Sequence, residues 1–234
     1  MGKQYTKEYV IKECNEMIKP IDQFYMKSFL NRTGKTSDTG EYYTEVIAEF
    51  LLKEENIELL NSIERIDRED YSVDGHDGSY NSKSNRFEEH VAMDMYKMSK
   101  EDNYWFEGIG KVIAYQVPLK KQQKDKVGKI DLLSKNDDTA YMLELKAPGS
   151  SETMLRCLLE SYTYLKRANQ ENLRRSLHID DVKYIKAAPL VYFKGNQWME
   201  MQEDRPKLRE LMTKLCITDV FYYDMEPVKY QIKL

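Results

Sequence analysis

The order of helical and strand-forming segments after residue 85 is the feature that most narrows the fold of this chain. Apolar residues at helical spacing predict a helix over 86–98, and runs rich in Val, Ile, Tyr and Leu predict strands. The predicted strands are 108–119, 127–135, 139–148 and 182–193, a long helix occupies 151–175, and a further helix around 203–215 precedes strands at 218–224 and 227–233. Helix, three strands, helix and strand in this order predict an α/β fold in which a central mixed sheet is flanked by helices.

The first 80 residues follow a different, helical pattern. Segments 5–30, with a break near Pro20, and 41–63 carry apolar residues at helical spacing. The stretch 65–85 is polar and rich in Gly, Ser and Asp, which is typical of a connecting loop. We therefore expect a helical N-terminal region over residues 1–80 and an α/β domain over residues 81–234. The N-terminal region is a candidate specificity or oligomerisation unit, and a homodimer is left open.

Composition limits the classes of function. No apolar run approaches the roughly 20 residues that cross a bilayer, and the charged N-terminus lacks the apolar stretch of a signal peptide. We therefore expect a cytoplasmic protein with no membrane partner. The cysteines form no CxxC pair and the histidines are scattered, so carboxylates would hold any metal, which suits Mg²⁺ or Mn²⁺. The net charge of −4 argues against unspecific coating of nucleic acid but permits a local basic groove.

Two consecutive predicted strands carry the residues that point to chemistry. Asp131 interrupts the apolar run of GKIDLL, while Glu144 and Lys146 in YMLELKAP share one strand face, because side chains two apart point the same way. The short connection SKNDDT favours a hairpin that brings Asp131 near Glu144. Two close carboxylates repel each other, and a bound cation would offset that repulsion. Lys146 beside them is suited to orient or deprotonate a water, or to stabilise charge on a phosphate.

A simpler interpretation competes with this one. Glu-x-Lys on a strand is frequent by chance and usually marks the solvated face of an antiparallel hairpin. Three features favour the functional interpretation: an acid on the preceding strand, an acidic helix before the strands, and a long helix directly after Pro148.

With these residues in this order, the chain resembles the PD-(D/E)xK nuclease superfamily, which has the restriction-endonuclease-like fold. GKIDLL followed by LELK is similar to the D–(D/E)xK hairpin of that family, and residues 85–193, somewhat under half of the chain, follow the element order of its core. The family's Pro before the Asp is absent, since Ile130 stands there. The resemblance implies that Asp131, Glu144 and the backbone carbonyl of Leu145 hold a divalent metal ion and that Lys146 is the catalytic lysine.

Many members of the family carry a further Glu on the helix before the first core strand, and the candidates here are Glu88 and Glu89. Glu88 borders the apolar stripe of its helix, with Val91 three residues further on, so it can lean toward the metal. The competing interpretation is a capping box, in which Glu88 bonds back to the amide of Asn85. Glu88 is the first candidate and Glu89 the fallback.

The RecB-like branch of the superfamily adds Gln-xxx-Tyr on the helix after the lysine. Glu160 and Tyr164 keep that spacing, with Glu in place of Gln, and are candidates for residues that support the metal ligands. Glu160 falls nearly opposite the apolar stripe of its helix, beside Arg156 and Arg167. That polar face either lines the substrate groove or is solvated, and the sequence favours neither interpretation.

A lysine-rich stretch, LKKQQKDKVGK, leads into the strand that carries Asp131. Such a run is usually a solvated hairpin tip. Beside a metal–carboxylate site, however, Lys120, Lys121 and Lys124 are suited to contact nucleic-acid phosphates.

The resemblance implies a Mg²⁺- or Mn²⁺-dependent nuclease, a hydrolase that acts on DNA in preference to RNA. The sequence leaves open whether it is an endonuclease or cuts from the ends. Its main rival is a catalytically inactive protein that binds nucleic acid or serves as a scaffold on the same fold. A third interpretation is an α/β interaction module whose motif matches by accident. The presence of Asp131, Glu144 and Lys146 together favours an active enzyme, because a degenerate copy tends to lose one of them.

Overall fold

A computed structural model describes residues 4–73, 75–79, 86–120, 128–224 and 231–233. Within these ranges, six strands form one sheet in the order β1-β2-β3-β4-β5-β6. The strands are β1 (Lys111–Pro118), β2 (Lys129–Asn136), β3 (Thr139–Lys146), β4 (Tyr184–Tyr192), β5 (Phe221–Asp224) and β6 (Gln231–Lys233). The first three form an antiparallel meander, β4 and β5 are added in parallel, and β6 returns antiparallel. The predicted mixed sheet is therefore confirmed.

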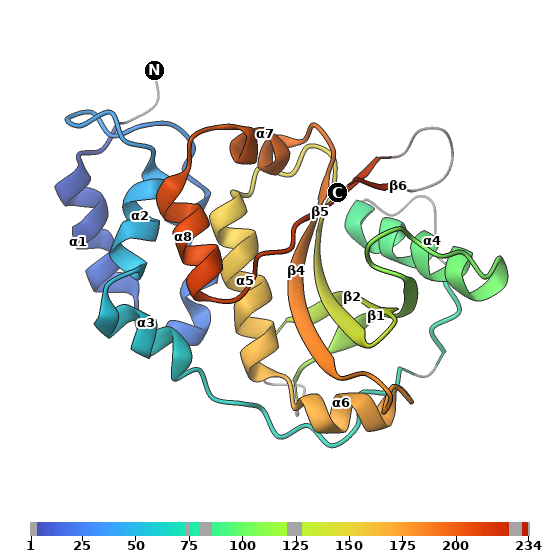
Figure 1. Ribbon diagram of the computed structural model, residues 1–234. Coiled ribbons are helices and arrows are strands. Elements are labelled where there is room, and N and C mark those ends of the chain that lie inside the picture. Colours follow the sequence, from blue (N-terminus) through green and yellow to red (C-terminus); the bar gives the residue numbers. More distant parts are fainter. Residues whose placement is uncertain (1–3, 74, 80–85, 121–127, 225–230, 234) are drawn as a thin grey trace.

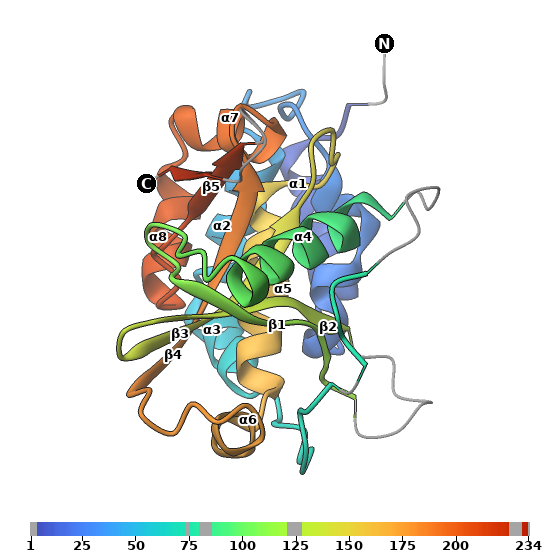
Figure 2. The ribbon, with the colours of Figure 1, turned by 90° about the vertical axis from the view of Figure 1, so that its right-hand side faces the viewer.

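Helices cover both faces of this sheet (Figure 1). α4 (Phe87–Glu101) packs on β1 and β2 on one face, which Figure 2 shows from the front, and α5 (Met154–Arg167) packs on β3 and β4 on the other. Side chains of β3 alternate between the two layers, so that Leu143 and Leu145 join the apolar cluster under α4 while Met142 joins the cluster under α5. The same alternation turns Glu144 and Lys146 toward α5.

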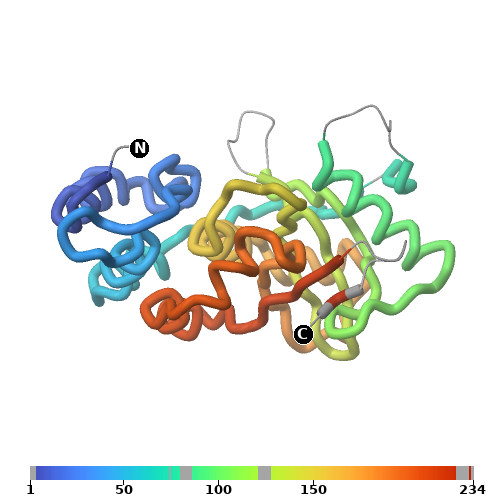
Figure 3. Tube along the Cα trace, turned by 90° about the horizontal axis from the view of Figure 1, so that it is seen from above, coloured from blue at the N-terminus to red at the C-terminus, as the bar shows by residue number. Residues whose placement is uncertain are grey.

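The N-terminal region is helical, as predicted. It consists of α1 (Lys7–Met17), α2 (Tyr43–Leu51), α3 (Glu54–Asn61) and two 3₁₀ turns over Ile21–Met26 and Ser28–Asn31. These elements lie at one end of the molecule, where they pack against α5 and α8 (Pro206–Lys214) (Figure 3). Their apolar side chains belong to the same hydrophobic cluster as those of α5, so this region and the α5 face of the sheet share a core.

The break expected near Pro20 in segment 5–30 is confirmed, since α1 ends at Met17 and two 3₁₀ turns follow Pro20. Two other predicted helices differ from those observed. The helix expected over 41–63 is divided where Lys53 adopts an extended conformation. The helix expected over 151–175 is divided into α5 and α6 (Gln170–Ser176), because the side chain of Asn169 accepts a hydrogen bond from the amide of Asn172 and starts a new helix.

A further short helix, α7 (Asn196–Gln202), has no counterpart in the sequence prediction. It follows β4 directly and packs against α5. Among the helices of the described ranges, none combines the length and the apolar character that a bilayer span requires.

Candidate active site

The hairpin of β2 and β3 brings Asp131 next to Glu144. Leu132 pairs with Leu143, and one residue further on the two strands separate. At that point the Leu145 amide donates its hydrogen bond to a side chain and not to the main chain of β2: the acceptor is Oδ2 of Asp131, at 3.0 Å. Its Oδ1 accepts a hydrogen bond from Nε2 of Gln116 at 3.0 Å. Asp131 is thus held between three strands with part of its surface accessible to solvent.

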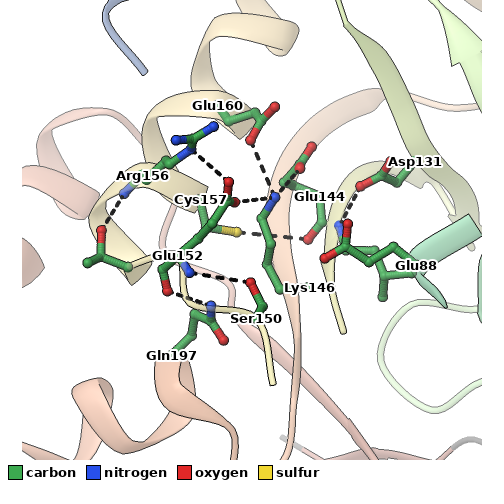
Figure 4. A network of polar contacts seen from close by, with 12 residues as sticks. Glu88, Asp131, Glu144, Lys146, Ser150, Glu152, Arg156, Cys157, Glu160 and Gln197 are labelled. Carbon is green, nitrogen blue, oxygen red and sulfur yellow. Dashed lines mark hydrogen bonds and ion pairs between the residues drawn. The ribbon is translucent and has the colours of Figure 1, made fainter. Parts of the chain in front are cut away.

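Lys146 lies in the middle of a group of carboxylates (Figure 4). Its Nζ lies 2.7 Å from Oε1 of Glu144, 2.7 Å from Oε2 of Glu152 and 3.4 Å from Oε2 of Glu160. The Lys146 and Glu144 side chains are almost fully buried. The ammonium group donates hydrogen bonds to Glu144 and Glu160 and forms an ion pair with Glu152.

Glu160 and Tyr164 both belong to this group. The hydroxyl of Tyr164, which is buried, donates a hydrogen bond to Oε1 of Glu160 at 2.8 Å. Because the Glu160 side chain is only 12% exposed and faces Lys146, the interpretation of this helix face as solvated is wrong for Glu160. Gly128, just before β2, packs against the same hydroxyl: a Cβ atom there would lie 1.8 Å from the Tyr164 oxygen.

The upstream acid that reaches the hairpin is Glu88. Its Oε1 accepts a hydrogen bond from the amide of Ala147, the residue after β3, at 3.1 Å. Glu89, the fallback candidate, instead pairs with Arg86 at 3.2 Å. α4 begins without a side-chain cap, and Asn85, the partner in the alternative capping box, lies outside the described residues. Glu88 therefore contacts the end of the strand that carries Glu144 and Lys146.

Burial and nearby negative charges perturb the pKa values of two acids of this group, Asp131 and Glu144. Burial raises the pKa of Asp131 to about 7, against the opposing influence of Lys146 and of the Leu145 amide. Burial, followed by the negative charges of Asp131 and Glu160, raises the pKa of Glu144 well above its ordinary value. Burial alone would lower the pKa of Lys146, but the carboxylates of Glu144 and Glu160 outweigh it and hold that pKa well above the ordinary value. Lys146 is therefore a fixed cation at neutral pH.

The donor chemistry of this group suits a divalent metal ion. Glu88, Asp131 and Glu144 offer only carboxylate oxygens, the ligands that Mg²⁺ and Mn²⁺ prefer. Burial, and after it the neighbouring negative charges, disfavours the ionised forms of Asp131 and Glu144, and a bound cation would offset both effects. The ligands are not preassembled, however: across the described parts of the chain, no three His, Cys, Asp or Glu side chains are grouped so as to hold a metal ion. Glu144 is instead paired with Lys146.

The remaining predicted residues have different outcomes. Leu145 contacts the site through its amide, which donates to Asp131, while its side chain is buried on the α4 face. Lys120 is partly buried, and its main-chain carbonyl accepts a hydrogen bond from Arg68 at 2.6 Å. Lys121 and Lys124 lie outside the described residues, so the predicted phosphate contacts of this loop stay a prediction.

Two residues of the site were not predicted from the sequence. Gln116 on β1 is the partner of Asp131, and Glu152, in the loop before α5, is a partner of Lys146. The Glu152 side chain is anchored by Nε of Arg156 at 2.9 Å, and its main-chain carbonyl accepts a hydrogen bond from Nε2 of Gln197 on α7 at 2.6 Å. A polar residue between Tyr115 and Val117 of an apolar strand was a signal for Gln116, but Glu152 reads as an ordinary residue preceding a helix.

A cavity of about 570 Å³ opens beside this group. One wall is the first turn of α4, including Phe87 and Glu88, and the other is the segment from Lys146 to Glu152. The volume falls within the range of about 300–1,000 Å³ that is typical of sites for small ligands. Lys146 and Glu88 both line it, so the group of charges can be reached from outside.

Comparison of the chain with protein-family models, with curated proteins and with solved structures gives no match.

Proposed function

We propose that this chain is a metal-dependent nuclease of the PD-(D/E)xK type, which hydrolyses phosphodiester bonds, of DNA in preference to RNA. The observation that carries the proposal is the convergence of Glu88, Asp131, Glu144 and Lys146 at the point where β2 and β3 separate, beside an open cavity. Burying several carboxylates around one lysine disfavours folding, so the arrangement is better explained by charge chemistry than by packing.

On this proposal, Asp131 and Glu144 are the residues that hold Mg²⁺ or Mn²⁺, with Glu88 and the Leu145 carbonyl as further ligands. The ion would supply positive charge that polarises the scissile phosphate and favours ionisation of the attacking water. The amide of Leu145 keeps the Asp131 carboxylate in place. Lys146, held protonated by its neighbours, is suited to stabilise negative charge on the phosphate rather than to act as a general base.

The experiment is a cleavage assay with plasmid DNA, single-stranded DNA and RNA, each with Mg²⁺, Mn²⁺ or EDTA. We expect cutting that requires the metal, and a loss of about 10²–10³-fold or more in Lys146→Met, since removal of one electrostatic stabiliser has effects of that size. Lys183→Met, which removes an exposed lysine just before β4, is the matched control and should cut normally. If wild type cuts none of these substrates with either ion, the catalytic proposal is wrong.

A second candidate is a catalytically inactive protein of the same fold that binds nucleic acid. The pairing of Glu144 with Lys146, which leaves no preassembled group of metal ligands in the described ranges, favours it. It predicts binding without cutting and a binding constant that falls with salt. The triple variant Lys120→Ala, Lys121→Ala, Lys124→Ala should then reduce the salt slope by about one unit for each lost phosphate contact. An unchanged slope would assign this loop to solvent.

A further inference from the structure

Gln116 has a backbone conformation that is unusual for its position in a strand. Its φ of +49° lies in the left-handed region, although it is not a glycine and lies inside β1. Tyr115 pairs with Leu132 and Val117 pairs with Ile130, so Gln116 lies opposite Asp131. The irregular residue of one strand therefore faces the candidate metal ligand of the next.

At the left-handed residue, the alternation of side chains between the two faces of the sheet is interrupted. In a regular strand, Tyr115 and Val117 would point to the same face because they are two residues apart. Here Tyr115 belongs to the cluster under α4 and Val117 to the cluster under α5. The change of face occurs at Gln116, whose side-chain amide donates to Oδ1 of Asp131 at 3.0 Å.

We propose that Gln116 is a positioning residue, which fixes the Asp131 carboxylate in the orientation that binds the metal ion; this inference rests on the proposed function. Both carboxylate oxygens of Asp131 accept hydrogen bonds, Oδ2 from the Leu145 amide and Oδ1 from the Gln116 side chain. Each oxygen keeps a lone pair for a cation, while rotation of the carboxylate is prevented. Without Gln116, the Leu145 amide would be the one hydrogen-bond donor left to the Asp131 carboxylate among the described residues.

The test measures Mn²⁺ binding by isothermal titration calorimetry, with thermal unfolding in EDTA as a second readout. Gln116→Leu keeps the approximate size of the side chain and removes the donor. Gln116→Gly also removes the donor but suits a positive φ better than any other residue. Gln202→Leu is the matched control, because Gln202 also donates a side-chain hydrogen bond, to the Trp198 carbonyl, away from the site.

We expect both Gln116 variants to bind Mn²⁺ about 10–100-fold more weakly than wild type, the range typical for partners of metal ligands. Their unfolding temperatures in EDTA should stay close to that of wild type, and Gln202→Leu should bind normally. A purely structural role predicts the reverse, a lower unfolding temperature with unchanged Mn²⁺ affinity, and would overturn the inference. Retained affinity in Gln116→Gly alone would assign the effect to the backbone and also overturn it. If wild type itself binds no Mn²⁺, the metal site of the proposed function is wrong, and the inference falls with it.

Discussion

Replacement of Asp131 by Asn should stabilise the metal-free protein at pH 8 by about 2 kcal/mol. Burial raises the pKa of Asp131 from 3.8 to about 7, which corresponds to about 4 kcal/mol of disfavoured ionisation at about 1.4 kcal/mol per pH unit. Because Asp131 is partly exposed, we reduce this to about half for screening by solvent. Asn fits the same space: its oxygen can accept from the Leu145 amide, and the Gln116 amide can rotate to accept from its NH₂ group.

The stabilisation by Asp131→Asn should depend on pH. Between about pH 4 and pH 7 the folded state keeps the Asp131 proton that the unfolded chain releases, so wild-type stability falls as the pH rises through this window. The advantage of Asp131→Asn should therefore shrink to less than about 1 kcal/mol at pH 5. Urea unfolding followed by circular dichroism, in EDTA at pH 5 and pH 8, measures both differences. Asp180→Asn, in an exposed turn, is the control and should change stability by less than about 0.5 kcal/mol. A variant that is no more stable than wild type at pH 8, or a difference that is the same at both pH values, would refute the reasoning.

Three other outcomes are expected, and the first of them rests on the proposed metal site. Mn²⁺ at 100 times its dissociation constant should stabilise wild type by about 2.7 kcal/mol, and Asp131→Asn should lose this response in thermal unfolding. Gly128→Ala should lower both the unfolding temperature and the cleavage rate, since its Cβ would displace the Tyr164 hydroxyl from Glu160; overpacking of this kind costs about 1–3 kcal/mol. Glu45→Ala should destabilise the protein by about 2–3 kcal/mol in urea unfolding, because the buried carboxylate accepts hydrogen bonds from two amides in the first turn of α8, at 2.8 and 2.9 Å. The control Glu49→Ala removes a surface ion pair and should change stability by less than about 1 kcal/mol.

The hairpin could be predicted because the residues that determine it are close together in the sequence. The alternation of Met142, Leu143, Glu144, Leu145 and Lys146 fixes which side chains share a face, and a short turn fixes the antiparallel pairing. The two apolar clusters follow that alternation. Helix ends were less predictable, because they depend on single residues such as Asn169, whose capping role competes with the helical pattern around it.

The partners of the site could not be predicted in the same way. Gln116, which bonds to Asp131, has a positive φ, and no residue pattern in VIAYQVP predicts a left-handed residue other than glycine. Glu152 reaches Lys146 because α7 and Arg156 hold its loop, and α7 itself was not predicted. For Glu160, the helical projection did not reveal what the side chain faces, which is a buried lysine and not solvent.

On the proposed function, the three carboxylate partners of Lys146 explain how one lysine can serve both a metal-free and a metal-bound site. When the ion binds, Glu144 would exchange the ammonium group of Lys146 for the ion. If Lys146 had no other partner, its side chain would then be free to turn away from the site. Glu152 at 2.7 Å and Glu160 at 3.4 Å prevent this, because they do not depend on Glu144 and are themselves anchored by Arg156 and Tyr164. On this proposal, the carboxylates around Lys146 have two tasks: some would bind the cation, and the others keep the lysine charged and in place beside the cavity.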